Sequence, residues 1–119
     1  LPLTPETRGM VDEAALARMK PGSILINTAR GEVVDETALV SALQSGHLAA
    51  AGLDVFATEP VPVDNPLLAL DNVIVSPHVS WYTADTMERY LTRAIRNCRR
   101  LADGQAPYSV VNRGADERE

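Results

Sequence analysis

Three ionisable side chains that could act together follow three separate apolar runs of the sequence: Arg30, Glu59 and His78. An arginine binds a carboxylate through two parallel N–H···O bonds, and a histidine exchanges a proton near neutral pH. A glutamate beside the histidine would favour the imidazolium form and orient the ring. Together these groups suit a 2-oxo acid or a 2-hydroxy acid, whose interconversion also needs a hydride from a cofactor. Gly31 is expected to let the chain turn sharply behind Arg30.

Each of these residues also has an ordinary structural interpretation. Arg30 could be a surface residue or an ion-pair partner, Glu59 a turn residue, and His78 a hydrogen-bonded structural histidine. Their joint position after three apolar runs is what favours a site. Asp54 closes the second run, where a carboxylate is costly unless it is paired or used. His47 follows a helix-ending glycine and is expected at the surface.

The apolar runs predict three buried strands, at 23–27, 50–55 and 72–76. Each run is short and nearly continuous, as in a sheet that is covered on both faces. Helical patterns lie between and after the strands, and this alternation predicts an α/β fold with a mostly parallel sheet. In such sheets ligands bind outside the carboxyl ends of the strands, so the three ionisable residues should converge on one edge.

Two similar segments, VDEAAL at 11–16 and VDETAL at 34–39, predict two helix starts. In each, an aspartate (Asp12 or Asp35) can accept from backbone N–H groups that have no partner within the helix. The valine before each aspartate can pack on the leucine at the fourth helical position. Gly46 is expected to end the second helix.

The last predicted helix runs from Thr83 to Ala102 and has two different sides. Apolar residues share one side: Met87, Leu91, Ala94, Ile95, Cys98, Leu101 and Ala102. Five arginines, expected to form a solvated face, lie mainly on the other: Arg89, Arg93, Arg96, Arg99 and Arg100. The polar tail from Gly114 to Glu119 is expected to fray.

The composition of the chain argues against several classes of protein and partner. The chain has 119 residues, 45% hydrophobic and 23% charged, with a net charge of −5. No basic stretch carries interleaved aromatics, so nucleic acid is not an expected partner. No apolar run approaches the roughly 20 residues of a membrane span. One cysteine, Cys98, fits a reducing cytoplasm and allows no internal disulfide. Two separate histidines make a poor ligand set, so no metal site is expected.

Long stretches of the sequence carry a family resemblance: LPLTPETRGM, MKPGSILINTARGEVVDETAL, SGHLAAAGLDVFATEP and NPLLALDNVIVSPHVS. Over residues 1 to about 80 the chain closely resembles the C-terminal part of the D-isomer-specific 2-hydroxyacid dehydrogenases. The resemblance implies a Rossmann-like doubly wound sheet and a catalytic set of Arg30, Glu59 and His78. It also implies that NAD or NADP contacts a set of residues at the strand ends: Pro2, Thr28, Ala29, Arg30, Asp54, His78 and Ser80.

Two residues that follow His78, Ser80 and Trp81, depart from the usual family pattern. Most members have a glycine where this chain has Ser80, and Trp81 follows it. A tryptophan here is similar to the subset related to the C-terminal-binding-protein corepressors. The resemblance implies that Trp81 lines the substrate pocket with Arg30 and His78 and favours a larger or more apolar substrate. It also keeps a second hypothesis open, a dehydrogenase-like interaction module of the corepressor type without metabolic turnover.

The family pattern divides the chain into two regions. Residues 1–80 are expected to form the C-terminal half of the NAD(P)-binding domain with the catalytic residues, and residues 81–119 a helix and tail that lead back toward the substrate domain. The Gly-x-Gly-x-x-Gly loop and the acidic residue that reads the ribose do not occur in the sequence. The chain is therefore expected to be a fragment, inactive alone, of a cytoplasmic homo-oligomeric NAD(P)-dependent enzyme that interconverts small 2-oxo and D-2-hydroxy acids.

Overall fold

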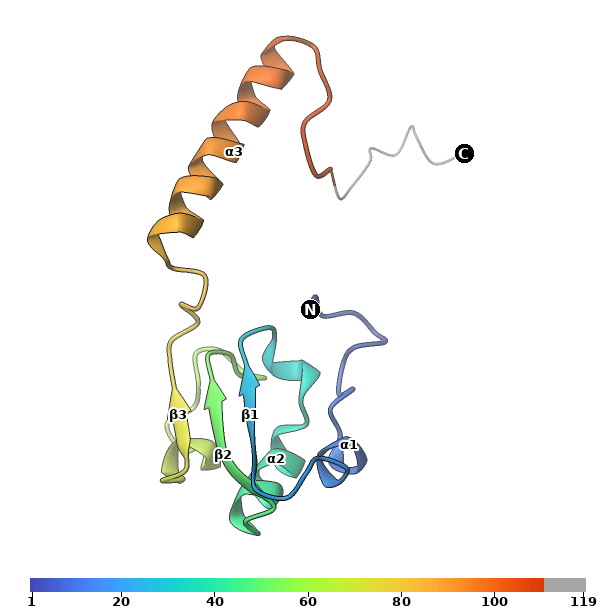
Figure 1. Ribbon diagram of the computed structural model, residues 1–119, viewed down its shortest axis with the longest axis vertical. Helices are drawn as coiled ribbons and strands as arrows, with labels where there is room; N and C mark the ends of the chain where they lie inside the picture. Colours follow the sequence, from blue (N-terminus) through green and yellow to red (C-terminus); the bar gives the residue numbers. More distant parts are fainter. Residues whose placement is uncertain (111–119) are drawn as a thin grey trace. The chain divides into compact units, whose positions relative to one another are not determined.

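The computed structural model describes residues 1–110, and the chain divides into two compact units after Ser80. The first unit holds the strands, the short helices and one longer helix, and the second is built on a single long helix (Figure 1). In chain order the elements are α1 (Glu13–Ala17), β1 (Ser23–Asn27), η1 (Gly31–Val33), α2 (Glu36–Gln44), β2 (Leu48–Leu53), η2 (Pro66–Ala69), β3 (Val73–Val75) and α3 (Ala84–Ala102).

The three strands form one parallel sheet in the order β1-β2-β3. Asn27 pairs with Leu53, and Leu53 pairs with Val75, so all three strands end at one level. The first strand has its predicted bounds, the second lies two residues earlier than predicted, and the third is shorter at both ends. Asp54 follows the second strand, and its carboxylate is bonded to the loop after β3.

Within residues 1–80, elements of the chain cover only one face of the sheet. On that face, strand residues pack with the helices in one core: Leu16, Leu25, Val34, Leu39, Leu43, Leu48, Ala51, Leu53, Phe56 and Leu67. The opposite face exposes Ile24, Ile26 and Ile74 by 61%, 73% and 79%. The connections from β1 to β2 and from β2 to β3 run in the same direction across the sheet. Because such crossovers are right-handed, the connecting segments lie on the same face of the sheet. The expectation of two covered faces is therefore not met by residues 1–80 alone.

Both predicted helix caps are confirmed. The Asp12 carboxylate accepts the N–H of Ala15 at 2.8 Å, and that of Asp35 accepts the N–H of Ala38 at 3.1 Å. Gly46 has a φ of +74° just after the end of α2, a conformation that glycine adopts without steric cost. These local signals mark the start of α1 and both ends of α2, the helix that connects β1 to β2.

In the second unit, α3 begins after a Thr83 cap and ends at Ala102, as predicted, and none of its residues is buried. The segment that follows is bonded to the helix: Arg100 Nε donates to the carbonyl of Ala106 at 2.6 Å, and Asn97 Oδ1 accepts the N–H of Tyr108 at 2.8 Å. Arg93 donates to Ser109 Oγ at 2.7 Å. Arg93 and Arg100 of the predicted solvated row therefore also bind the segment that follows the helix, and Arg93 stays exposed.

The predicted fraying tail, from Gly114 to Glu119, lies outside the described residues. Among residues 1–110, no helix has the length and apolar character needed to cross a membrane.

Candidate functional site

His78 and Glu59 form an ion pair beyond the carboxyl ends of β3 and β2. Nδ1 of His78 lies 2.8 Å from Oε2 of Glu59, and the other carboxylate oxygen accepts the N–H of Phe56 at 3.0 Å. The hydrogen bond from His78 and that from Phe56 hold the pKa of Glu59 below its usual value, against partial desolvation. The positive charges of His78 and Arg30 add to this lowering. The structure therefore brings two of the predicted residues into contact, and the charge of the third, Arg30, acts on Glu59.

Arg30 stands at a strand exit whose shape is set by Asn27. This buried side chain donates from Nδ2 to the carbonyl of Arg30 at 2.9 Å and accepts the N–H of Ala29 at 3.0 Å. The guanidinium itself is exposed and donates to the carbonyl of Ala29 at 2.6 Å. The sequence interpretation missed Asn27, although an asparagine that closes an apolar strand is a recognisable signal of such a turn.

Gly31 has a different role from the one predicted. Its φ is not positive, so a left-handed turn does not explain the glycine. Instead, a Cβ atom at this position would overlap the backbone carbonyl of Phe56 and the backbone nitrogen of Ala57. The glycine therefore allows the loop after β2, which carries Glu59, to lie backbone to backbone against the loop after β1.

The buried carboxylate of Asp54 binds the chain on both sides of His78. It accepts from Ser76 Oγ at 2.5 Å, from the N–H of Val79 at 2.9 Å and from the N–H of Ser80 at 2.8 Å. Desolvation opposes the charge, but the bonds from Ser76, Ser80 and Val79 outweigh it and hold the pKa of Asp54 far below its ordinary range. Asp54 is thus paired, which explains how a carboxylate is tolerated there.

The backbone of His78 is in the left-handed region, with a φ of +55°. This conformation is uncommon for residues other than glycine and persists where the surroundings enforce it. The two consecutive N–H groups that follow it converge on Asp54 like the donors of a small anion-binding nest. The histidine that faces Glu59 is therefore held in place through its backbone.

A pocket of about 250 Å³ lies beside the pair. Most of its wall is apolar, and acidic and imidazole groups stand at its edge. Its lining residues are Asp54, Phe56, Glu59, Pro60, Val61, Ser76, Pro77 and His78. An apolar hollow with a few convergent polar groups is the usual form of a small-molecule site.

The other predicted contact residues are spread along the first unit or lie beyond it. The carbonyl of Pro2 accepts from Thr7 Oγ1 at 2.9 Å, and Thr28 is exposed after β1. Trp81 begins the second unit, where its ring stands edge-on to that of Tyr82 at 5.5 Å. The cofactor and substrate roles of these residues stay predictions. His47, expected at the surface, is instead half-buried, with Nε2 3.1 Å from the carbonyl of Leu16.

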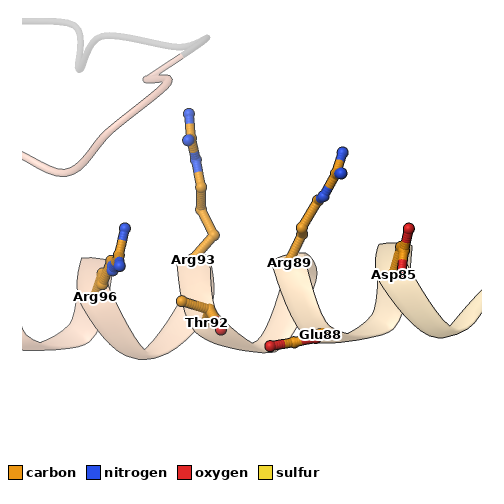
Figure 2. Close-up of a pocket in the computed structure, with 6 residues that line it drawn as sticks. All are labelled: Asp85, Glu88, Arg89, Thr92, Arg93 and Arg96. Atoms are coloured by element: carbon orange, nitrogen blue, oxygen red, sulfur yellow. The ribbon is translucent and has the colours of Figure 1, made fainter.

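A second hollow, of about 480 Å³, lies on the surface of α3. It is lined by Asp85, Glu88, Arg89, Thr92, Arg93 and Arg96, and Figure 2 shows the three arginine side chains extending from one side of the helix. This hollow belongs to the second unit, and the paired residues His78 and Glu59 belong to the first. Within the part of the chain that the structure describes, there is no group of three or more His, Cys, Asp or Glu side chains that could hold a metal ion.

Known proteins match the chain over the region of this site. Residues 1–80 match the family model described as D-isomer specific 2-hydroxyacid dehydrogenase, NAD binding domain. The chain belongs to this family. Its α/β fold, with a parallel sheet and a long final helix, is therefore the predicted Rossmann-like one, and the resemblance identified in the sequence is confirmed.

Two curated relatives show how much of a family member the chain covers. It is 49% identical over 112 residues to D-3-phosphoglycerate dehydrogenase of Mycobacterium leprae, and 48% identical over 112 residues to glyoxylate/hydroxypyruvate reductase B of Citrobacter koseri. The match covers 94% of this chain in both cases, but 21% and 35% of those two proteins. The chain thus spans about a fifth to a third of the length of these relatives.

Solved structures agree with this match. A D-isomer specific 2-hydroxyacid dehydrogenase of Xanthobacter autotrophicus Py2, in complex with NADPH and MES, is 46% identical with a TM-score of 0.82. D-lactate dehydrogenase of Lactobacillus jensenii, with NAD+, is 38% identical with a TM-score of 0.84. These matches cover 94% and 95% of this chain and 46% and 38% of the solved chains.

Proposed function

We propose that residues 1–119 are the C-terminal part of an NAD(P)-dependent D-2-hydroxyacid dehydrogenase, with Arg30, Glu59 and His78 as its catalytic residues. The observation that carries the proposal is the 2.8 Å ion pair between His78 and Glu59 at the strand edge, next to the charge of Arg30. Residues 1–80 supply half of the nucleotide-binding domain, and residues 81–119 lead toward the substrate domain. The rest of the enzyme corresponds to the additional length of the relatives.

The three side chains divide the work on a 2-oxo acid. The exposed guanidinium of Arg30 binds the substrate carboxylate through its fork and polarises the neighbouring carbonyl. His78 gives its proton to the carbonyl oxygen during reduction and takes it back from the hydroxyl during oxidation. Glu59, through its contact with Nδ1, orients the imidazole ring of His78.

The residues at the strand ends fit the nicotinamide end of a cofactor. Asp54 Oδ1 accepts hydrogen bonds from Ser76 Oγ and the N–H of Val79, Oδ2 accepts the N–H of Ser80, and the Ser80 side chain also bonds this carboxylate, which fixes it at the strand edge. Thr28 and Ala29 stand beside Arg30 at the end of β1. NAD or NADP supplies the hydride when it is bound. The 119 residues contain no Gly-x-Gly-x-x-Gly loop, so the pyrophosphate is bound by the part of the enzyme upstream.

The finer assignments belong to the same proposal. The substrate is a small 2-oxo or 2-hydroxy acid, and Trp81 lines its pocket and favours a larger or more apolar side chain. Ser80 contacts the cofactor together with Pro2. The enzyme is a cytoplasmic homo-oligomer. Support for the compartment comes from Cys98, an exposed free thiol, and support for self-association from the uncovered apolar face of the sheet.

The test uses a parent protein that contains residues 1–119 together with the additional length found in its relatives. A panel of 2-oxo acids of increasing side-chain size is offered with NADH and with NADPH, and cofactor oxidation is followed by absorbance. Turnover that is lost in His78→Ala supports the proposal. If the folded parent binds the cofactor and turns over no 2-oxo acid, the corepressor-type interaction module takes its place.

A further inference from the structure

A single carboxylate outside the proposed catalytic set holds both ends of the loop that carries Glu59. Glu36 is the first residue of α2, and its Oε1 accepts the N–H of Ala57 at 2.6 Å. Its Oε2 accepts from Nδ2 of Asn65 at 3.2 Å. Asn65 in turn accepts the N–H of Leu67 through Oδ1 at 2.9 Å and so starts η2. The loop is thereby bonded to the start of α2 just before Glu59 and again after it.

These bonds continue to the proposed proton donor. Ala57 follows Phe56, whose N–H donates to Glu59 Oε1, and Glu59 Oε2 pairs with His78. The backbone of Phe56 and Ala57 is also packed against Gly31, where no side chain fits. Two neighbouring N–H groups of one short segment are therefore fixed by two glutamates, one that faces His78 and one that belongs to α2.

We propose that Glu36 is a positioning residue, which sets the loop so that the carboxylate of Glu59 meets His78. Its part in turnover rests on the dehydrogenase function proposed above, whereas its effect on Glu59 can be measured without turnover. An acidic residue in the first turn of a helix also interacts favourably with the helix dipole. That interaction needs only the negative charge, while positioning needs the length of the side chain, so substitutions can separate the two roles.

The experiment compares Glu36→Ala, Glu36→Asp and Glu36→Gln in the 119-residue chain. Aspartate keeps the charge but is one methylene shorter, and glutamine keeps the length and an oxygen that can accept from Ala57. The pKa of Glu59 is read from its side-chain carboxyl carbon by NMR titration. We expect it to rise toward the ordinary glutamate value in the alanine and aspartate variants, because the bonds that lower it are made less often. The glutamine variant keeps an acceptor for Ala57 and loses the bond from Asn65, so its rise should be smaller than that of the alanine variant.

Two controls complete the design. Glu32→Gln removes a charge from η1, where Glu32 pairs with Arg8 at 2.7 Å and does not touch the loop, so the pKa of Glu59 should not change. Asn65→Ala removes the partner of Glu36 Oε2 and should raise the pKa of Glu59 by less than Glu36→Ala does. The Asn65 variant and Glu36→Asp also keep the test available if Glu36→Ala does not fold.

The proposal is overturned if Glu59 titrates as in the wild type in Glu36→Asp and Asn65→Ala. It is also overturned if the glutamine variant behaves like the alanine variant, since charge and not reach would then explain the effect. A parent protein without turnover would overturn the dehydrogenase function and leave this titration result unchanged, so the two failures can be told apart.

Discussion

The carboxylate of Asp54 fixes the backbone conformation of His78. It accepts from Ser76 Oγ before the histidine and from the N–H groups of Val79 and Ser80 after it, while His78 itself has a φ of +55°. A charged acceptor that receives several hydrogen bonds at once stabilises a conformation that the chain would otherwise leave. Asp54, which follows β2, therefore holds the backbone of His78, which follows β3.

Asp54→Asn should lower the free energy of unfolding, because the amide NH2 group is placed against backbone donors. The pKa of Asp54 is depressed in the folded chain, so its contribution to stability is present above the unfolded value of about 3.9 and is lost as the pH falls through the folded value. The stability difference between wild type and variant should therefore be full at pH 7 and shrink below about pH 4. Urea unfolding at several pH values measures it, with Asp64→Asn, an exposed loop residue, as control. A difference that does not change with pH would show that the charge of Asp54 is not what stabilises the loop.

Glu59 and His78 should act as one unit in catalysis. Reduction needs a protonated His78, so kcat/KM of the parent should fall as the pH rises. Glu59→Gln keeps the shape and removes the charge, so this limb should move toward acid, and oxidation at neutral pH should suffer less. His78→Ala should cost more in both directions, and the double variant should be little worse than His78→Ala. Profiles of kcat/KM against pH for the four proteins test this. Additive losses or an unmoved limb would reduce Glu59 to a turn residue.

Arg30→Lys should impair the parent far more than a conserved charge suggests. Lysine cannot reproduce the two parallel bonds that an arginine makes to a carboxylate. We expect kcat/KM for the best 2-oxo acid to fall. The decrease should correspond to a loss of about 2–3 kcal/mol in transition-state stabilisation, the scale of a hydrogen bond to a charged group. Arg8→Lys, at an exposed arginine that pairs with Glu32, is the matched control and should leave kcat/KM unchanged. Equal activity of both variants would remove Arg30 from the substrate site.

Much of the first unit could be predicted because its signals are local. The apolar run at 23–27 and the aspartate caps at Asp12 and Asp35 each depend on a few neighbouring residues, and the structure has all three where they are predicted. Convergence at the sheet edge followed from parallel topology alone. The sequence could not show which side chains hold the site together, since Glu36 and Ala57 are 21 residues apart and meet only in the fold.

The errors have the same physical origin. Gly31 was attributed to a turn because the segment it packs against lies far along the sequence. The bonds from Arg93 and Arg100 to residues 106–109 are missed because helical periodicity identifies a polar face but does not show that the following segment returns to it. The covered and uncovered faces of the sheet depend on the direction of the crossovers, which a run of apolar residues does not encode.

The isolated 119-residue chain should bind NADH weakly and have little or no dehydrogenase activity. A pyrophosphate is normally bound by the backbone N–H groups of a glycine-rich loop and the helix that follows it, and the sequence has no such loop. Calorimetric titration of NADH into the chain should give a dissociation constant weaker than micromolar. Binding at micromolar concentrations or tighter would mean that the strand-end residues bind the cofactor without the loop.

The isolated chain should also self-associate, because it exposes two apolar surfaces. One is the open face of the sheet with Ile26 and Ile74, and the other is the apolar side of α3, where Leu91 and Ile95 are 56% and 53% exposed. Uncovered apolar patches and free strand edges both favour association. We therefore expect a dimer or a larger species by sedimentation at tens of micromolar chain, formed through the helix around Met87 to Leu101.

Two substitutions in α3 test whether the helix is the surface that associates. Ile95→Glu places a charge on the apolar side and should shift the chain toward monomer. Thr92→Glu adds the same charge beside the arginines of Figure 2 and should leave the association unchanged. If both variants sediment as the wild type does, the contact is made by the open sheet face, and Ile26→Glu becomes the informative variant. A wild-type chain that is monomeric under these conditions would contradict the prediction, because two exposed apolar surfaces would then be tolerated without a partner.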